Sequence, residues 1–408
     1  MKKFKVGVIG LGLRGAWWAC EMLTALPYVE ITALCDLYED RLEKSAAAIR
    51  EKTGKEVPLL TRDYRALIRS DEVDTVLVLS GWGNHFDAAI RCMKAGKPVG
   101  MEVGGAYSVQ QCYELVRTYE ETETPFMLLE NCCYGETEMT VTDMARKGLF
   151  GTIVHCDGGY CHEMRNTLAG INRDRHYRVS EYIHRNCESY PTHELGPIAK
   201  LLNIGNGNRF VSLVSMSSKA AGMKDFLADK ENPYRGVDYA QGDIFTTLIK
   251  CAGGETVRIT LDTTLPRYYS RDFTVRGTGG MYEERTNSVY FGNNEAHAKK
   301  HGSWKEEWGN MEKYMEEYRH PLWDEYRKDG IQGNHGGMDY LVISAFFDAL
   351  DQGLPMPIDV YDAVSWMVVT VLSEQSVALG SMPVAFPDFT GGRWMEKKQP
   401  VNSKYNLL

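Results

Sequence analysis

The first 130 residues alternate short apolar runs with amphipathic stretches of helical length. Apolar runs rich in β-branched residues occur at positions 4–9, 31–35, 73–79, 97–102 and 125–130. Alternation of buried strands with helices is typical of a doubly wound α/β domain with a parallel sheet. In such a domain every loop from a strand to its helix lies at one edge of the sheet, where ligands bind.

The pattern changes after about residue 150. Runs with strict alternation of apolar and polar positions occur at 153–162, 209–217, 243–251, 255–264 and 271–277. This periodicity predicts a large, mostly antiparallel, open-faced sheet with one covered face. Because a chain of 408 residues is long for a single core, we predict two domains, with boundaries at 1–130 and 131–408.

Two helical stretches, 337–352 and 360–379, close the chain. We expect the second domain to be of the α+β class, with these C-terminal helices packing back on the first domain. An exposed sheet face of this kind often pairs with a copy of itself, so we also expect a homo-oligomer through the C-terminal sheet.

A glycine-rich loop follows the first apolar run without a break. Its sequence is Gly10-Leu11-Gly12-Leu13-Arg14-Gly15. Gly10 permits a tight turn, Gly12 lets the backbone approach a pyrophosphate, and Gly15 lets the next helix pack closely. The second strand ends at Asp36, whose carboxylate can accept both ribose hydroxyls of NAD and would repel the extra phosphate of NADP. This context predicts an NAD-binding Rossmann domain rather than a plain glycine turn.

Polar loops follow three further strands at the same predicted edge. They are Ser80-Gly81-Trp82-Gly83-Asn84-His85, Glu102-Val103 and Glu130-Asn131. Loops at this edge usually carry function, so we expect them beside the nicotinamide end of the cofactor. The alternative is that Trp82 and His85 merely cap a helix and fill a corner.

Two candidate pairs lie in the second domain. Tyr160 and His162 are two residues apart on one strand, so both side chains leave the same face and can exchange a proton with a substrate. The alternative is a hydrogen-bonded structural pair.

The other pair lies in the motif Tyr190-Pro191-Thr192-His193. Pro191 suits the first turn of a helix and Thr192 can help to cap it. Tyr190 and His193 then share one side of the helix start, where the positive end of the helix dipole favours the neutral imidazole that a general base needs. A capped helix with an incidental histidine is the alternative.

Composition narrows the classes of partner. The formal net charge of −9 argues against nucleic acid and anionic membranes. No run approaches the roughly 18 apolar residues that a membrane span needs. The ten cysteines are scattered without a C-x-x-C pair, which suits free thiols in a reducing cytoplasm. The start of the chain lacks the features of an export signal, and no spacing suggests a metal site.

Motifs in the same order along nearly the whole chain resemble one family. They are Leu13-Arg14-Gly15, Trp82 with His85, Glu102-Val103, Glu130-Asn131-Cys132, Gly158-Gly159-Tyr160, Tyr190-Pro191-Thr192-His193, Asp262-Thr263-Thr264, Tyr269-Ser270-Arg271 and His335-Gly336-Gly337-Met338-Asp339. The chain resembles glycoside hydrolase family 109, the NAD-dependent α-N-acetylgalactosaminidase branch of the glucose–fructose oxidoreductase and inositol dehydrogenase superfamily.

Departures from related sequences bear on the chemistry. The dehydrogenases of the superfamily usually carry Glu-Lys-Pro where this chain has Glu102-Val103-Gly104, and an Asp at the position of Ser189. The glycosidase branch tends to have Asn-Gly-Asn or Asn-Gly-Asp before the Tyr-Pro-Thr-His motif and a Gly after it. Here Arg185-Asn186-Cys187-Glu188-Ser189 precedes the motif and Glu194 follows it. These changes bear on sugar preference more than on reaction type.

The resemblance implies hydrolysis of a small glycoside without net redox chemistry, through transient oxidation at sugar carbon 3, elimination and water addition. It implies His193 as the base at the carbon-3 hydroxyl, Tyr160 as the base at carbon 2, His162 as an assistant and Glu130 as an orienting group. It also implies a sugar-binding set of Arg178, Tyr190, Thr192 and Tyr269. Residues expected to contact NAD are Gly10, Gly12, Leu13, Arg14, Gly15, Asp36, Ser80, Trp82, Asn84, His85, Glu102, Val103 and Asn131. An NAD-dependent sugar or polyol dehydrogenase and a non-catalytic NAD-holding protein remain open as alternatives.

Overall fold

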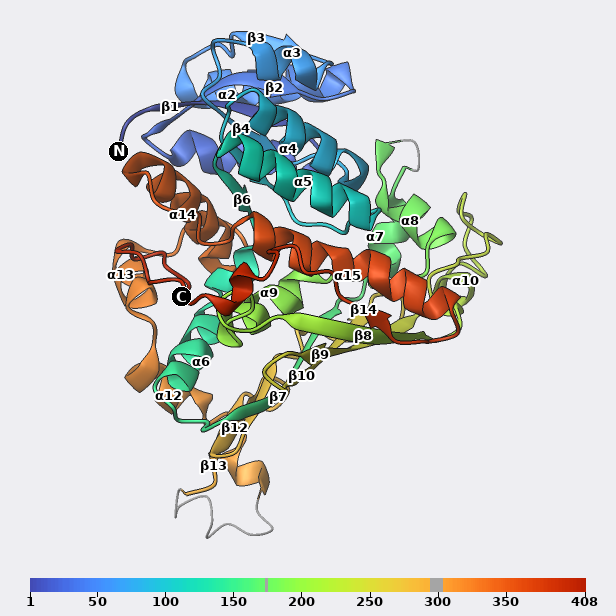
Figure 1. Cartoon of the computed structure of the whole chain (residues 1–408). Helices are drawn as coiled ribbons and strands as arrows, with labels where there is room; N and C mark the ends of the chain where they lie inside the picture. Colours follow the sequence, from blue (N-terminus) through green and yellow to red (C-terminus); the bar gives the residue numbers. More distant parts are fainter. Residues whose placement is uncertain (173–174, 294–303) are drawn as a thin grey trace. The chain divides into compact units, whose positions relative to one another are not determined.

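The computed structural model describes residues 1–172, 175–293 and 304–408, and its chain divides into two compact units (Figure 1). Unit 1 comprises Met1–Glu130, Gln332–Val364 and Pro400–Leu407. Unit 2 comprises Asn131–Ile331, Ser365–Gln399 and Leu408. Each unit is built around one sheet.

Unit 1 contains a six-stranded, fully parallel sheet in the order β3-β2-β1-β4-β5-β6. Its strands are β1 (Phe4–Ile9), β2 (Val29–Cys35), β3 (Leu59–Thr61), β4 (Thr75–Val78), β5 (Val99–Met101) and β6 (Phe126–Leu128). The order reverses between β1 and β4, and this is the switch point at which such sheets bind ligands. Helices of this unit are α2 (Glu39–Thr53), α3 (Tyr64–Arg69), α4 (His85–Lys94), α5 (Val109–Thr122) and α14 (Met338–Gln352).

The helix after the glycine loop begins earlier than the sequence pattern predicts. We expect a helix from Ala16, whereas α1 (Leu13–Trp17) begins three residues before it and continues through a π-turn, η1 (Trp18–Met22), and a 3₁₀ turn, η2 (Leu23–Ala25). A Cβ at Gly15 would lie 2.0 Å from the carbonyl oxygen of Gly10. Gly15 is therefore required inside the helix, because only a bare backbone fits against the loop.

Unit 2 contains an eight-stranded sheet in the order β13-β12-β11-β7-β10-β9-β8-β14. Its strands are β7 (Ile153–Cys161), β8 (Phe210–Ser217), β9 (Ile244–Cys251), β10 (Thr256–Asp262), β11 (Thr274–Gly277), β12 (Gly280–Glu283), β13 (Ser288–Phe291) and β14 (Val384–Ala385). Only the β7–β10 pairing among these is parallel. The predicted fold class, a parallel-sheet Rossmann domain plus a domain with a mostly antiparallel sheet, is confirmed.

β11 is shorter than the predicted strand 271–277. The amides of Arg271 and Phe273 donate to the two carboxylate oxygens of Glu284, at 3.2 and 2.8 Å. The Glu284 side chain thus takes the place of strand partners for these two amides, although the carbonyl of Arg271 still accepts from the amide of Gly159 in β7.

Helices of unit 2 cover the sheet and its ends. They include η4 (Asn131–Tyr134), α6 (Glu136–Arg146), α7 (Arg165–Gly170), α8 (Arg178–His184), α9 (Thr192–Leu201), α10 (Gly222–Phe226), η6 (Trp304–Glu307), α12 (Met311–Tyr318), α13 (Pro321–Asp329) and η8 (Arg393–Met395). The long helix α15 (Val360–Ala378) continues from unit 1 into unit 2. Within the described parts of the chain, no helix has the length and apolar character needed to cross a membrane.

A glycine in β7 brings α9 close to the sheet. A Cβ at Gly158 would lie 2.9 Å from the Cβ of Glu194 and 3.0 Å from the Cδ1 of Ile198, so any side chain there would push the helix away. Tyr160 leaves the same face of β7 two residues later. The close approach of α9 therefore places the side chain of Tyr160 beside the first turn of that helix, which carries His193.

Candidate active site

Tyr160 is the centre of a group of rings in unit 2 that meet tilted or edge to face. Its hydroxyl lies 3.1 Å from the Nδ1 of His162. Its ring centroid lies 4.4 Å from that of Tyr190 and 5.8 Å from that of His193. Tyr190 and His193 are themselves 4.8 Å apart, edge to face. The two pairs predicted separately from the sequence, on β7 and at the start of α9, therefore form one constellation.

Tyr269 completes this constellation from the connection that follows β10. Its ring meets that of His162 edge to face, with centroids 5.3 Å apart. Tyr160 and His193 are only 8 % and 9 % exposed, whereas Tyr269 is 52 % exposed. The group, which we call the aromatic cluster (Tyr160, His162, Tyr190, His193 and Tyr269), thus has a sheltered interior and an open side, as a site for a small ligand requires.

A buried arginine borders the aromatic cluster. The guanidinium of Arg178, the first residue of α8, lies 5.3 Å from the centre of the Tyr190 ring, and its Nη1 is 3.0 Å from the sulfur of Met164. Burial disfavours its charge, but the neighbouring phenols of Tyr177 and Tyr160 outweigh this and raise its pKa, so it remains a cation. A fixed positive charge beside Tyr160 favours the negative charge that its oxygen would carry as a base.

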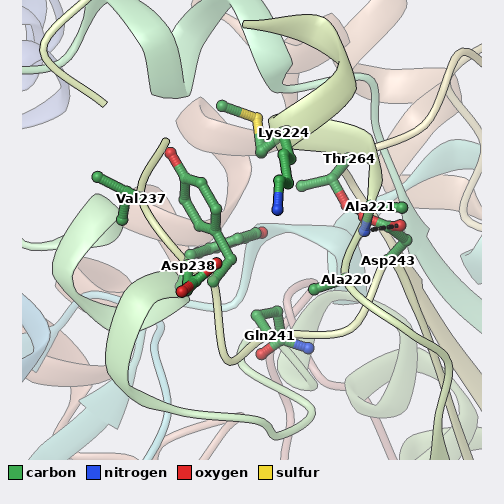
Figure 2. Close-up of a pocket in the computed structure, with 11 residues that line it drawn as sticks. Ala220, Ala221, Lys224, Val237, Asp238, Gln241, Asp243 and Thr264 are labelled. Carbon is green, nitrogen blue, oxygen red and sulfur yellow. Dashed lines mark hydrogen bonds between the residues drawn. The ribbon is translucent and has the colours of Figure 1, made fainter. Parts of the chain in front are cut away.

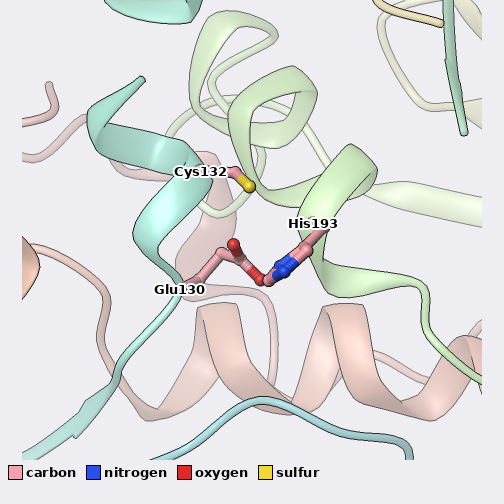
Figure 3. A group of neighbouring side chains, drawn as sticks. All are labelled: Glu130, Cys132 and His193. Atoms are coloured by element: carbon pink, nitrogen blue, oxygen red, sulfur yellow. The ribbon is translucent and has the colours of Figure 1, made fainter. Parts of the chain in front are cut away.

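Cys132 and His193 lie next to each other in unit 2. The sulfur of Cys132 and a ring nitrogen of His193 are within 4.8 Å (Figure 3). The Nη1 of Arg271 lies 3.8 Å from the same sulfur, and Arg271 forms an ion pair with the buried carboxylate of Glu138. Figure 3 also draws Glu130, a completely buried residue with which the first stretch of unit 1 ends. Roles for Glu130 and the predicted absence of a metal remain predictions.

A separate pocket of about 420 Å³, open mouth included, lies elsewhere in unit 2. Its lining includes Tyr182, Lys224, Tyr239, Gln241 and Asp243, and Figure 2 shows the amino group of Lys224 pointing into it. The sequence-predicted site residues do not line this pocket. Tyr182, which lines the pocket, belongs to the same apolar core as Tyr160.

The glycine loop of unit 1 has the geometry that a dinucleotide needs. Gly10 has a φ of +97°, and a Cβ there would lie 2.5 Å from the backbone nitrogen of Ser80. A Cβ at Gly12 would meet no described atom within 4 Å, so the loop is open where a pyrophosphate would approach. The amide of Leu11 donates to the Oδ2 of Asp36 at 2.7 Å, which fixes the acid beside the loop.

The loops after β4 and β5 are packed against each other. A Cβ at Gly104 would lie 2.6 Å from the Cδ1 of Trp82, so the indole occupies the space that a side chain would need. Val103, at the position where the dehydrogenases described above carry lysine, is 1 % exposed. His85 is completely buried with its Nε2 2.9 Å from the carbonyl oxygen of Ser80, and burial lowers its pKa to about 4. His85 therefore supports the loop in its neutral form.

Comparison with known proteins decides the family. The model of the glycosyl hydrolase 109 C-terminal domain matches residues 134–396, and that of the oxidoreductase-family NAD-binding Rossmann fold matches residues 4–129. The chain belongs to glycosyl hydrolase family 109. It is 35 % identical to a glycosyl hydrolase family 109 protein of Stenotrophomonas maltophilia, over 97 % of this chain and 91 % of that one. It is 37 % identical to an alpha-N-acetylgalactosaminidase of Tannerella forsythia, over 90 % and 82 %.

Solved structures show the fold of this family 109 hydrolase. A levoglucosan dehydrogenase in complex with NADH and levoglucosan superposes with a TM-score of 0.67 at 16 % identity, covering 95 % of this chain and all of that one. The myo-inositol dehydrogenase of Lactobacillus casei gives 0.65 at 13 %, covering 97 % and 100 %. At such identities only the fold is shared, so the dehydrogenase alternative is supported by fold alone. The predicted family is confirmed, and the protein is an enzyme of the glycosidase class.

For this family 109 hydrolase, the prediction that Thr192 helps to cap the helix is wrong. Thr192 does not cap α9: the helix begins at Thr192, its N-cap is Pro191, and the Thr192 hydroxyl is buried without a hydrogen-bond partner among the described residues. The hydroxyl is enclosed because the helix starts one residue earlier than the capping pattern requires, so its role in sugar binding remains a prediction.

Glu188 is an ionisable group near the site that the sequence did not single out. It is completely buried, and a backbone hydrogen bond from Tyr190 only partly offsets the cost of burying its charge. Burial raises its pKa to about 8. Its backbone is fixed by Ser373 and Thr370 of α15, at 2.9 and 2.7 Å. Because these partners are about 180 residues away in the sequence, only the folded chain reveals the burial.

Proposed function

We propose that this enzyme hydrolyses α-linked N-acetylhexosaminides, α-N-acetylgalactosaminides first among them, by oxidation, elimination, water addition and reduction at one sugar. The aromatic cluster carries the proposal, because it gathers a phenol and two imidazoles on one sheltered face. The name of the Tannerella forsythia relative supports the choice of sugar. NAD, held by the glycine loop and Asp36, would accept a hydride from carbon 3 and return it within each turnover.

His193 is the proposed base for the carbon-3 hydroxyl. It would take the hydroxyl proton while the carbon-3 hydrogen leaves as hydride, so that the alcohol becomes a ketone. The ketone makes the proton on carbon 2 acidic, and Tyr160 would remove it. Loss of the aglycone oxygen from carbon 1 then forms an enone, and the leaving group takes up a proton. His162 can assist this proton transfer because it contacts the Tyr160 hydroxyl.

Water completes the balance. It adds across the carbon 1–carbon 2 double bond: its hydroxyl goes to carbon 1, and its proton replaces the one given to the leaving group. Tyr160 would exchange its proton with solvent and then return a proton to carbon 2. His193 would return its proton to the carbon-3 oxygen as the alcohol is restored. The net reaction is glycoside plus water giving free sugar plus alcohol, and no pair of opposed carboxylates is needed.

Arg178 answers the main chemical objection to a tyrosine base. A phenol with its ordinary pKa of about 10 is a weak base at neutral pH. The positive charge of Arg178 would favour the negative charge that develops on the Tyr160 oxygen as it acts as a base, and the same cation can donate to sugar oxygens. We assign Tyr190 and Tyr269 to the walls of the sugar site because their rings flank Tyr160 and His162.

The test uses purified protein and a panel of aryl glycosides with no added NAD. We expect release of the aryl alcohol from the α-N-acetylgalactosaminide without accumulation of NADH, because the cofactor is used and regenerated on the protein. Stoichiometric NADH formation from free sugars, without cleavage of any glycoside, would instead identify a dehydrogenase. Cleavage of other sugars only would correct the substrate and retain the mechanism.

A further inference from the structure

Arg14, inside the glycine loop, is held by two carboxylates of unit 1. Its Nε donates to the Oε2 of Glu102 at 2.8 Å. Its Nη1 and Nη2 donate to the two oxygens of Asp339 at 3.2 and 2.9 Å, a bidentate pair. Its guanidinium also lies 5.0 Å from the centre of the Trp18 ring. Arg14 therefore contacts both the end of β5 and the first turn of α14.

On the side away from Arg14, Asp339 contacts a turn whose backbone is strained. Asp339 is completely buried, and its Oδ2 is 2.8 Å from the Nδ1 of His335. His335, a non-glycine residue, has a φ of +54°, and Gly336 and Gly337 that follow it also have positive φ. Backbone of this kind persists only where its surroundings hold it, and here it aims the His335 ring at Asp339.

The contact is ionic in the native protein. Burial opposes the charge of Asp339, but the hydrogen bond from His335 and the charge of Arg14 together lower its pKa. Burial likewise opposes the charge of Arg14, and Glu102 and Asp339 overcome it and raise its pKa. Loss of one partner would leave an uncompensated buried charge, so these groups are fixed together.

We propose that Arg14, Glu102, Asp339 and His335 form a network that retains NAD by keeping the glycine loop in its binding conformation. The inference rests on the proposed function, in which the cofactor stays bound through many turnovers. Backbone amides of the loop and of the helix after it bind a pyrophosphate only when they point to a common centre. A loop fixed before binding loses less entropy on binding and opens less often to release the ligand.

The test compares NAD retention in purified holoenzyme variants without sugar. In Asp339→Asn the charge is lost and the shape is kept, and we expect NAD release during timed dialysis to be about tenfold faster than in the wild type. Asp351→Asn is the matched control, because Asp351 lies near the other end of α14 and accepts from the amide of Lys2 at 2.8 Å. The control should retain NAD as the wild type does.

Two further variants keep the proposal falsifiable if Asp339→Asn fails to fold. His335→Gln changes a half-exposed side chain, and Arg14→Lys keeps the charge but cannot donate in a planar fork to both carboxylates. Each should release NAD faster while far-ultraviolet circular dichroism remains native. Folded variants that all retain NAD like the wild type would overturn the network. A wild type that itself carries no NAD, or that accumulates NADH with sugar, would instead count against the proposed function.

Discussion

The guanidinium groups of Arg14 and Arg178 are both held by neighbouring side chains, but these neighbours differ in chemistry. The guanidinium of Arg14 in unit 1 is bound by two carboxylates, whose negative charges offset its own. The guanidinium of Arg178 in unit 2 lies among the phenols of Tyr177, Tyr160 and Tyr190. The contacts of Arg14 therefore hold the glycine loop in place. Arg178 lies where its positive charge favours the negative charge that would form on Tyr160 during a reaction.

The two units also differ in what they contribute to the proposed reaction. Arg14 and Asp339 carry opposite charges, because their contact raises the pKa of Arg14 and lowers that of Asp339. The aromatic cluster is made of groups that gain and lose protons, and burial of Tyr160 and His193 to 8 % and 9 % exposure strengthens every charge placed there. Unit 1 is therefore suited to holding a ligand and unit 2 to moving protons.

Among the substitutions that test the aromatic cluster of unit 2, Tyr160→Phe should have the largest effect. Removing the phenolic oxygen removes the proposed carbon-2 base and its contact with His162, and we expect turnover to fall by about 10⁴-fold. NAD content and the thermal unfolding midpoint should stay close to those of the wild type. Assays of kcat with the preferred aryl glycoside check this, and unchanged kcat would remove Tyr160 from the mechanism.

Glu188 extends the comparison to a buried acid whose charge is disfavoured by burial. Its folded-state pKa of about 8 lies above the value of a free glutamate, so the folded protein holds a proton that the unfolded chain has lost. Its contribution to stability is fully present below about pH 4.5 and is lost as pH rises towards 8.

At neutral pH the folded protein must keep Glu188 protonated, which costs free energy, and Glu188→Gln should remove this cost. We expect the variant to be more stable than the wild type by about 4 kcal/mol at pH 7.5 and nearly equal at pH 4.5, by chemical denaturation. Equal stability of the two proteins at both pH values would show that Glu188 is ionised or solvated in the native state.

Arg178→Met tests whether the field at the aromatic cluster matters. We expect kcat to fall by about 100-fold, because the phenolate loses its neighbouring cation, and Arg178→Lys to recover part of the loss. Arg165→Met is the control, since Arg165, the first residue of α7, pairs with Glu163 and lies over the Phe226 ring, outside the aromatic cluster. A loss confined to KM, with kcat preserved, would reduce Arg178 to a sugar-binding residue.

Local sequence predicts the parts of this protein that depend on local chemistry. The loop from Gly10 to Gly15 and the strand-to-helix alternation around it are readable because each glycine serves a turn formed by its neighbours. The pairing of Tyr160 with His162 is readable because a strand repeats every two residues.

Long-range contacts account for what the sequence does not reveal. Asp339 reaches Arg14 across 325 positions, and Glu188 is enclosed by Thr370 and Ser373 of α15. No periodicity records either partner. The meeting of Tyr160 with His193 also depends on Gly158, whose role appears only when α9 is seen to pack against it.

The central claim is that a resident cofactor is reduced and reoxidised while carbon 2 of the sugar exchanges its proton. The most direct measurement runs the hydrolysis in heavy water without added NAD, and reads deuterium at carbon 2 of the released sugar by NMR. We predict one deuterium at carbon 2 for each sugar released and a constant level of NADH once turnover is steady. Released sugar with only protium at carbon 2 would contradict the mechanism, because direct displacement at carbon 1 leaves that position untouched.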